Sequence, residues 1–176
     1  MSGFPILTIM LLVPAVAAVA CLFTNAQTAR WIALAATLVD FVLGIVLWAN
    51  FQIGPDAPQW QFVEYSSLFG KPDGVSFAWA LGIDGYALML IMLSVFLMPI
   101  CVLASRSIDK RVGEYMAAFL FMETLMIGVF AAQDLLLFYI FFEGGLIPMY
   151  LIIGIWGGPE RIKASYKFFL YTLLGS

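Results

Sequence analysis

Long apolar stretches alternate with short polar ones along most of this chain of 176 residues. Crossing the ~30 Å hydrocarbon layer of a bilayer takes about 20 helical residues. Apolar helices close to this length are expected at 5–23, 31–50, 86–104, 115–132 and 135–156. A sixth, expected from residue 165, reaches only about half way across by residue 176. The pattern therefore predicts an all-α, polytopic membrane protein with five complete transmembrane helices and a truncated sixth, in a piece of a longer chain.

The same pattern divides the chain into three parts. Residues 1–51 hold the first two helices, 52–85 form a long loop on the outer side of the membrane, and 86–176 hold the remaining helices. The loop carries six aromatic residues around a turn at 71–74: Trp60, Phe62, Tyr65, Phe69, Phe77 and Trp79. This spacing predicts a short hairpin or an interfacial segment lying on the bilayer surface. A docking surface for a partner subunit is the functional alternative.

Composition supports a membrane location and excludes several kinds of site. Hydrophobic residues make up 64% of the chain and charged residues 11%, whereas soluble domains have roughly 25% charged residues. The net charge of −3 argues against binding to nucleic acid. The absence of histidine removes the commonest transition-metal ligand. Because Cys21 and Cys101 both lie in apolar stretches, packed free thiols are expected rather than a zinc or iron–sulfur site.

The basic residues predict how the helices are oriented. Seven of the eight follow the first, third and fifth helices, and Lys71 is the exception. By the positive-inside rule, the loops with the seven basic residues face the cytoplasm or its organellar equivalent. The N-terminus is then expected outside.

Two of the acidic residues in the apolar stretches have a plausible structural role. Asp134 lies at the start of the helix at 135–156, where an aspartate caps the N-terminus and interacts with the helix dipole. Asp40 lies near the centre of the second helix, beside Thr37. It is interpreted either as a functional group or as a neutral acid that hydrogen-bonds a neighbouring helix.

Glu143 is the strongest candidate for a functional residue. A charged side chain at mid-bilayer costs about 2.5–3.5 kcal/mol on insertion scales, so proteins that keep one there usually use it. Gly144 and Gly145 follow it directly, and Pro148 is expected to kink the helix and to leave the carbonyl of Gly144 free. A lysine that approaches such a carboxylate favours its charged form, and one that recedes favours the protonated form. Glu143 is therefore predicted to take part in proton translocation.

Glu123 is a further candidate because it is expected at the same depth. The turn between the fourth and fifth helices is short, so these helices form an antiparallel hairpin centred near Gln133. Glu123 lies ten residues before this centre and Glu143 ten after it, which places each about 15 Å into the layer. Equal depth does not show that the two face each other. A functional and a structural role for Glu123 both stay open.

Four segments resemble one known family. They are LGIDG at 81–85, FFEGGLIPM at 141–149, WGG at 156–158 and FLYTLLGS at 169–176. These segments are similar to the family of respiratory complex I (NADH-quinone oxidoreductase) membrane subunits called subunit M in bacteria and subunit 4 in mitochondria. The resemblance spans the whole chain, weakly in the first two helices and strongly from about Asp84 onward.

The resemblance implies an antiporter-like protein of about fourteen helices with inverted repeats and broken helices. Residues 86–176 would begin the proton-translocating repeat. Glu143 matches the family's fifth-helix glutamate, which is paired with a lysine on a later helix beyond this chain. The subunit would carry no cofactor, since NADH, FMN, iron–sulfur clusters and quinone are used by partner subunits. Its partners would be neighbouring antiporter-like subunits and the lipid of a bacterial inner membrane, or of the mitochondrial inner membrane.

Two other interpretations remain. A subunit of a multisubunit Na⁺/H⁺ antiporter shares the fold and a fifth-helix glutamate. A non-catalytic membrane scaffold would use the buried acids only to lock helices together, and then Glu143→Gln would keep all activity. The motifs at 141–149 and 156–158 favour the complex I subunit.

Overall fold

The structure is a computed structural model that describes residues 5–69 and 77–176. Its helices are α1 (Ile6–Leu22), α2 (Ala26–Ala49), α3 (Gly85–Ala104), α4 (Val112–Ala131), α5 (Leu135–Gly144), α6 (Leu146–Trp156) and α7 (Arg161–Gly175). Two strands, β1 (Gln61–Phe69) and β2 (Phe77–Ile83), lie between α2 and α3. The turn expected at 71–74 lies outside the described residues. The predicted all-α membrane bundle is confirmed.

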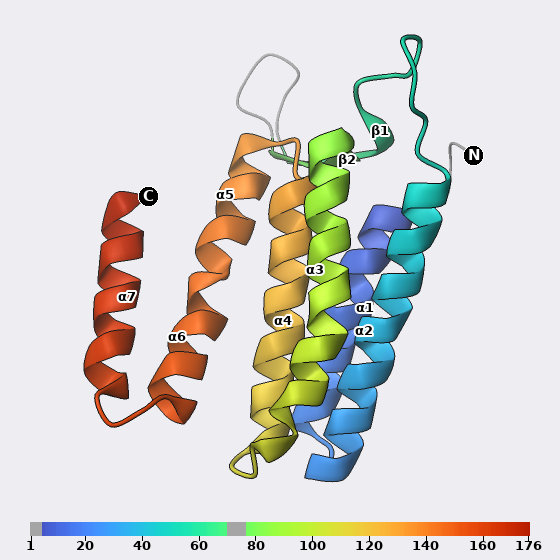
Figure 1. The fold of residues 1–176 in the computed structure, drawn as a ribbon. Helices are drawn as coiled ribbons and strands as arrows, with labels where there is room; N and C mark the ends of the chain where they lie inside the picture. Colours follow the sequence, from blue (N-terminus) through green and yellow to red (C-terminus); the bar gives the residue numbers. More distant parts are fainter. Residues whose placement is uncertain (1–4, 70–76) are drawn as a thin grey trace.

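Helices α1 to α4 form the bundle. They run side by side, with α1 against α2 and α4 and with α2 against α3, while α5, α6 and α7 extend from the α4 side (Figure 1). Within the described residues, four segments are long and apolar enough to cross a membrane: 26–49, 85–107, 112–131 and 135–156. Helix α1 is shorter, at 17 residues, which is still within the range of spanning helices.

The predicted helix boundaries hold to within a few residues, with two larger differences. Helix α2 begins at Ala26, five residues before the predicted start, because Asn25 is extended and the residues after it favour helix. Helix α7 begins at Arg161, after the Gly157–Gly158 turn, rather than at 165. The helix expected at 135–156 is interrupted at Gly145, which keeps helical backbone angles (φ −62°, ψ −22°), so that α5 ends at Gly144 and α6 begins at Leu146. Pro148 explains it, because proline cannot donate to the carbonyl of Gly144.

The predicted hairpin in the outer loop is also present. Strands β1 and β2 pair antiparallel, with Tyr65 opposite Ala80. The hairpin is joined to the bundle at the α4–α5 turn, where the amide of Gln133 donates to the carbonyl of Ala80 at 2.8 Å. Leu81 and Ile83 are fully buried in the hydrophobic core at this end. The hairpin is therefore a packed part of the bundle.

A glutamate on the hairpin caps the first helix. One carboxylate oxygen of Glu64 accepts from the amide of Leu7 at 2.8 Å, and the other accepts from the amide of Thr8 at 3.0 Å and from the Thr8 hydroxyl. The amides in the first turn of a helix have no partner within the helix, and the helix dipole favours an anion beside them. Glu64 on β1 thus caps α1, whose N-cap residue Pro5 makes no side-chain cap hydrogen bond.

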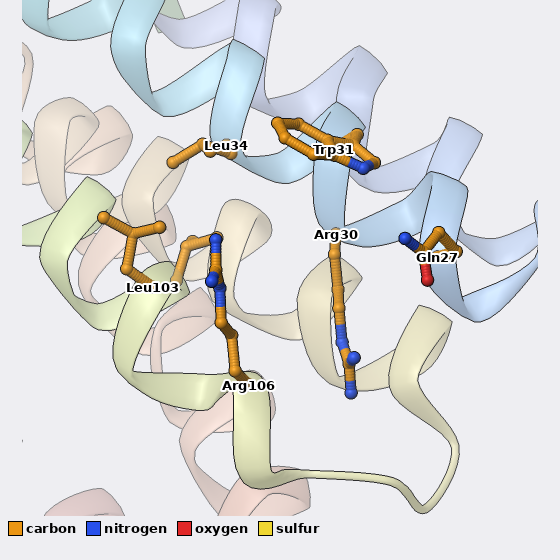
Figure 2. Close-up of a pocket in the computed structure, with 7 residues that line it drawn as sticks. Gln27, Arg30, Trp31, Leu34, Leu103 and Arg106 are labelled. Carbon is orange, nitrogen blue, oxygen red and sulfur yellow. The ribbon is translucent and has the colours of Figure 1, made fainter.

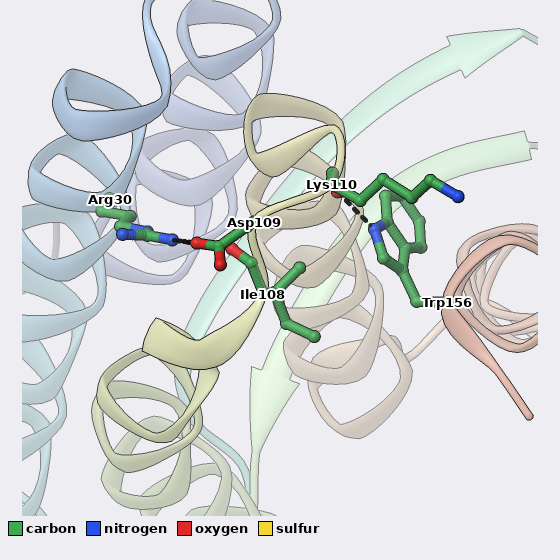
Figure 3. Close-up of polar contacts among 5 residues, drawn as sticks. All are labelled: Arg30, Ile108, Asp109, Lys110 and Trp156. Atoms are coloured by element: carbon green, nitrogen blue, oxygen red, sulfur yellow. Dashed lines mark hydrogen bonds and ion pairs between the residues drawn. The ribbon is translucent and has the colours of Figure 1, made fainter.

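The opposite end of the bundle holds the basic loops. The turns between α1 and α2, α3 and α4, and α6 and α7 all lie at this end (Figure 1). Figure 3 shows the contacts that join them. Arg30 Nη2 donates to the carbonyl of Ile108 at 2.7 Å, and Trp156 Nε1 donates to the carbonyl of Lys110 at 2.7 Å. The α3–α4 loop is thereby held by both α2 and α6.

Helices α4 and α5 approach each other closely at two glycines. A Cβ atom at Gly128 would lie 2.6 Å from the ring of Phe141, and one at Gly144 would lie 3.2 Å from Leu125 Cδ2. The Phe141 ring also meets the Trp79 ring edge-on, at a centroid distance of 6.0 Å. A larger residue at 128 has no free space and must displace the aromatic ring.

Removing the cap on α1 should destabilise the protein. We expect Glu64→Ala to lower the free energy of unfolding by about 1 kcal/mol, because two amides at the start of α1 lose their acceptor. Unfolding titrations of the full-length protein with sodium dodecyl sulfate would measure this change. Glu160→Ala, at an exposed residue, is the control, and an equal loss in both variants would contradict a capping role.

Adding one methyl group at Gly128 should separate α4 from α5. We expect Gly128→Ala to cost about 1–3 kcal/mol in the same titration, as overpacking does. Gly85→Ala is the matched control, since a Cβ there meets nothing within 4 Å. Replacing the ring as well, in Gly128→Ala with Phe141→Leu, should recover part of the loss. No recovery would show that the cost does not come from this contact.

Candidate functional site

Glu143 lies at the break between α5 and α6. The helix that carries it begins at Asp134, whose carboxylate accepts from the amides of Leu136 at 2.8 Å and Leu137 at 3.0 Å. The predicted capping role of Asp134 is thus confirmed. The last regular turn of α5 ends with the amide of Gly145 donating to the carbonyl of Phe141 at 3.1 Å. Glu143 is therefore held near the end of a capped helix.

The helix break is connected to the hairpin end of the bundle by side-chain contacts. Trp79 Nε1 donates to the Thr8 hydroxyl at 3.0 Å, and Thr8 in turn binds Glu64. The Trp79 ring packs on Phe141, two residues before Glu143. A series of contacts thus runs from the cap of α1 through the hairpin to the helix of the candidate site.

The Glu143 carboxylate has two different environments. Oε1 accepts a hydrogen bond from the hydroxyl of Ser176, which follows α7. Oε2 is buried and has no hydrogen-bond partner among the residues described. A buried polar atom without a partner is costly in an apolar setting. The site therefore offers one satisfied and one unsatisfied oxygen, an arrangement suited to a group that binds a further donor or a proton.

Glu123 lies near the same level as Glu143 but faces another part of the bundle. Gly144 of α5 packs against Leu125 of α4, so the two acids lie at similar heights in the bundle. Glu123 is 0% exposed, and so is Asp40 on α2, a helix that packs against α4. The neighbouring Thr124 hydroxyl points to α1, where it donates to the carbonyl of Leu11 at 3.4 Å. The structure therefore associates Glu123 with Asp40 and not with Glu143.

Asp40 and Glu123 form a second group of buried acids. Both are 0% exposed, and none of their four carboxylate oxygens has a hydrogen-bond partner in the part of the chain that the structure describes. Thr37, beside Asp40, donates to the carbonyl of Leu34 in its own helix at 3.0 Å and so does not bind Asp40. Two carboxyl groups at one buried place bind each other when one of them carries a proton. This pair can therefore link α2 to α4.

Some residues important for the site had no signal in the sequence. Glu64 lies on β1, and nothing near it in the sequence marks it as the cap of a helix 56 residues away. Gly128 is an ordinary residue of an apolar helix, and the motif at 141–149 that contains Phe141 does not reveal the contact between the two. No group of three or more His, Cys, Asp or Glu side chains placed to hold a metal is found among the described residues.

Comparisons with known proteins agree with the geometry. Residues 132–176 match the family model described as NADH:quinone oxidoreductase/Mrp antiporter, TM. The chain is 51% identical over 150 residues to NADH-quinone oxidoreductase subunit M of Rhodobacter capsulatus, a match that covers 85% of the chain and 28% of that relative. It is 46% identical over 173 residues to NADH-ubiquinone oxidoreductase chain 4 of Arabidopsis thaliana, a match that covers 95% of this chain and 34% of that relative.

A solved structure shares the fold. A chain of respiratory complex I from Thermus thermophilus with bound NADH superposes with a TM-score of 0.78 and 29% identity, over 96% of this chain and 33% of that one. The chain spans about a third of the length of these relatives. Sequence, fold and the glutamate at the helix break lead to one assignment: the chain belongs to the family of NADH-quinone oxidoreductase subunit M and chain 4.

Proposed function

We propose that this chain is part of a membrane subunit of NADH-quinone oxidoreductase that translocates protons, with Glu143 in the proton path. The observation that carries the proposal is the carboxylate at the α5–α6 break, with one oxygen bound by Ser176 and the other buried without a partner. Intramembrane acids of this kind are costly and usually functional.

Glu143 is suited to hold a proton and to release it. Its unsatisfied Oε2 accepts a proton or a cationic donor, and the family resemblance supplies a lysine on a later helix of the intact subunit as that donor. With the lysine close, the ionised form is stabilised and the proton leaves; with the lysine distant, a proton neutralises the carboxylate. Gly144 and Gly145 keep bulky side chains away from the carboxylate during both steps.

The partners follow from the same proposal. NADH, FMN, iron–sulfur clusters and quinone belong to partner subunits, and their reaction drives the proton step here. Residues 86–176 form the start of the proton-translocating repeat. Residues 1–51 form the two helices that flank it, and residues 52–85 form the outer loop with its hairpin. The neighbouring subunits are other antiporter-like subunits, in a bacterial inner membrane or in the mitochondrial inner membrane. The N-terminus of this chain lies on the outer side of that membrane.

Glu123 has a different role in this proposal. It is sealed between helices beside Asp40, so a proton reaches it only if α2 and α4 separate. We assign the pair to helix packing and Glu143 to proton transfer.

Replacing Glu143 tests the proposal directly. In inverted vesicles that carry the full-length protein in its complex, we expect Glu143→Gln to lower NADH-driven dye quenching at least about tenfold, because an amide carries no transferable proton. Glu160→Gln, at an exposed acid, should leave quenching unchanged. Full quenching in Glu143→Gln would reduce the residue to a hydrogen-bonding role. Quenching that responds to a sodium pulse and not to NADH would instead indicate an Na⁺/H⁺ antiporter.

Glu123 can be tested in the same vesicles. We expect Glu123→Gln to keep most of the NADH-driven quenching, because the side-chain amide can donate to the Asp40 carboxylate across the α2–α4 contact. Glu123→Leu should lower the free energy of unfolding, since it leaves Asp40 buried alone. A loss of quenching in Glu123→Gln as large as in Glu143→Gln would place Glu123 in the proton path.

A further inference from the structure

A pocket opens at the basic end of the bundle, between α2 and the end of α3. Its volume is about 270 Å³, just below the ~300 Å³ at which sites for drug-sized ligands begin. It is lined by side chains of opposite character, two arginines and a set of apolar residues: Arg30, Arg106, Trp31, Leu34, Val102 and Leu103. In Figure 2 the arginines extend from different segments, Arg30 from α2 and Arg106 from the short 3-10 helix (Ser105–Ser107) that follows α3. The pocket has room for a small anionic group.

Both arginines have side-chain N–H groups that do not bind any residue that the structure describes. Arg30 uses Nη2 for the carbonyl of Ile108, while its Nε is buried without a hydrogen-bond partner among the described residues. Its contact with Asp109 is long, at 3.5 Å, and that carboxylate is almost fully exposed. Arg106 is exposed and makes no side-chain hydrogen bond or ion pair to any residue that the structure describes, so its guanidinium N–H groups are available to a ligand. The pocket thus holds positive charge and a buried donor that the protein itself does not satisfy.

These donors match the chemistry of a phosphate group. The guanidinium is a planar fork whose N–H groups bind two oxygens of one phosphate, and two such groups can neutralise one phosphodiester. Apart from Gln27, the remaining walls are apolar, since Leu34, Val102 and Leu103 belong to the membrane-spanning parts of α2 and α3. Trp31, which is 61% exposed, lies at the level where tryptophan rings meet lipid headgroups. An apolar wall beside a pair of cations suits a ligand with a phosphate head and a hydrocarbon body.

We propose that this pocket binds the headgroup phosphate of an anionic phospholipid, held between Arg30 and Arg106, with an acyl chain lying along Leu34 and Leu103. Basic pockets between transmembrane helices at the end that carries the basic loops are suited to anionic headgroups. Arg30 also holds the α3–α4 loop through Ile108, so a bound lipid ties α2, α3 and this loop together. The proposal does not depend on the proton-transfer function.

The test uses photo-reactive lipids on the full-length protein in its complex. The complex is reconstituted in vesicles that contain a trace of diazirine-labelled phosphatidylglycerol or, separately, diazirine-labelled phosphatidylcholine. After illumination and digestion with pepsin, mass spectrometry locates the adducts. We expect phosphatidylglycerol adducts on peptides that contain residues 27–34 and 102–106, and far fewer from phosphatidylcholine.

Two variants test whether Arg106 is responsible for the labelling by phosphatidylglycerol. Arg106→Gln should lower the phosphatidylglycerol adducts on these peptides about fivefold, the effect of one basic residue at an anionic surface. Lys163→Gln removes the same charge from an exposed residue at the same end of the bundle and should leave the adducts unchanged. Arg106 is the better variant than Arg30, because it makes no contact that holds the α3–α4 loop.

Four outcomes would overturn the proposal. Equal labelling by the two lipids would show that the pocket does not select an anionic headgroup. Equal adducts in Arg106→Gln and the wild type would show that the arginine pair does not hold the lipid. Loss of the adducts when inorganic phosphate is added in excess would identify a site for free phosphate, and absence of adducts in the wild type would mean that protein covers the pocket in the complex.

Discussion

The structure depends on one constraint, the need to satisfy backbone polar groups where no water is present. In hydrocarbon an unpaired amide or carbonyl costs several kcal/mol, so irregular backbone occurs there only where protein covers it. The described spans are helical from end to end except at the α5–α6 break. At that break α4 covers the chain, with Gly128 against Phe141 and Leu125 against Gly144. The helix can therefore be interrupted beside Glu143 because a neighbouring helix lies close enough to exclude lipid.

The hairpin extends this support to the end of the bundle at which α1 begins. Glu64 neutralises the first turn of α1, and Thr8 connects that cap to Trp79. Trp79 in turn packs on Phe141, the ring that fills the space above Gly128. The outer loop and the helix break thus share a set of contacts, although the residues involved lie far apart along the chain. A segment that resembles a surface loop in composition takes part in positioning the candidate site.

The features predicted from sequence are those that depend on local patterns. Apolar length predicted the helices, Asp134 stood where a cap is expected, and Pro148 after two glycines predicted the break. The unpredicted features depend on how helices rotate about their axes. A helix that is apolar on every side, as α4 largely is, shows no preferred face, so the association of Glu123 with Asp40 was not visible. The Glu64 cap was missed for a related reason, because a strand residue shows no periodic relation to the helix that it caps.

The two candidate acids, at similar levels in the membrane, differ in access. Glu123 lies on the side of α4 that faces α1 and α2, is 0% exposed and has a buried carboxylate as its neighbour. Glu143 lies on the other side, at an interrupted helix, where its carboxylate reaches a hydroxyl beyond α7. A proton carrier must exchange with a donor on one side and an acceptor on the other, which requires a path as well as a carboxylate. Under the proposed function, a proton would reach Glu143 from the side of α6 and α7, because close packing at Gly128 keeps α4 and α5 together. Access rather than depth would then separate a carboxylate that transfers protons from one that joins helices.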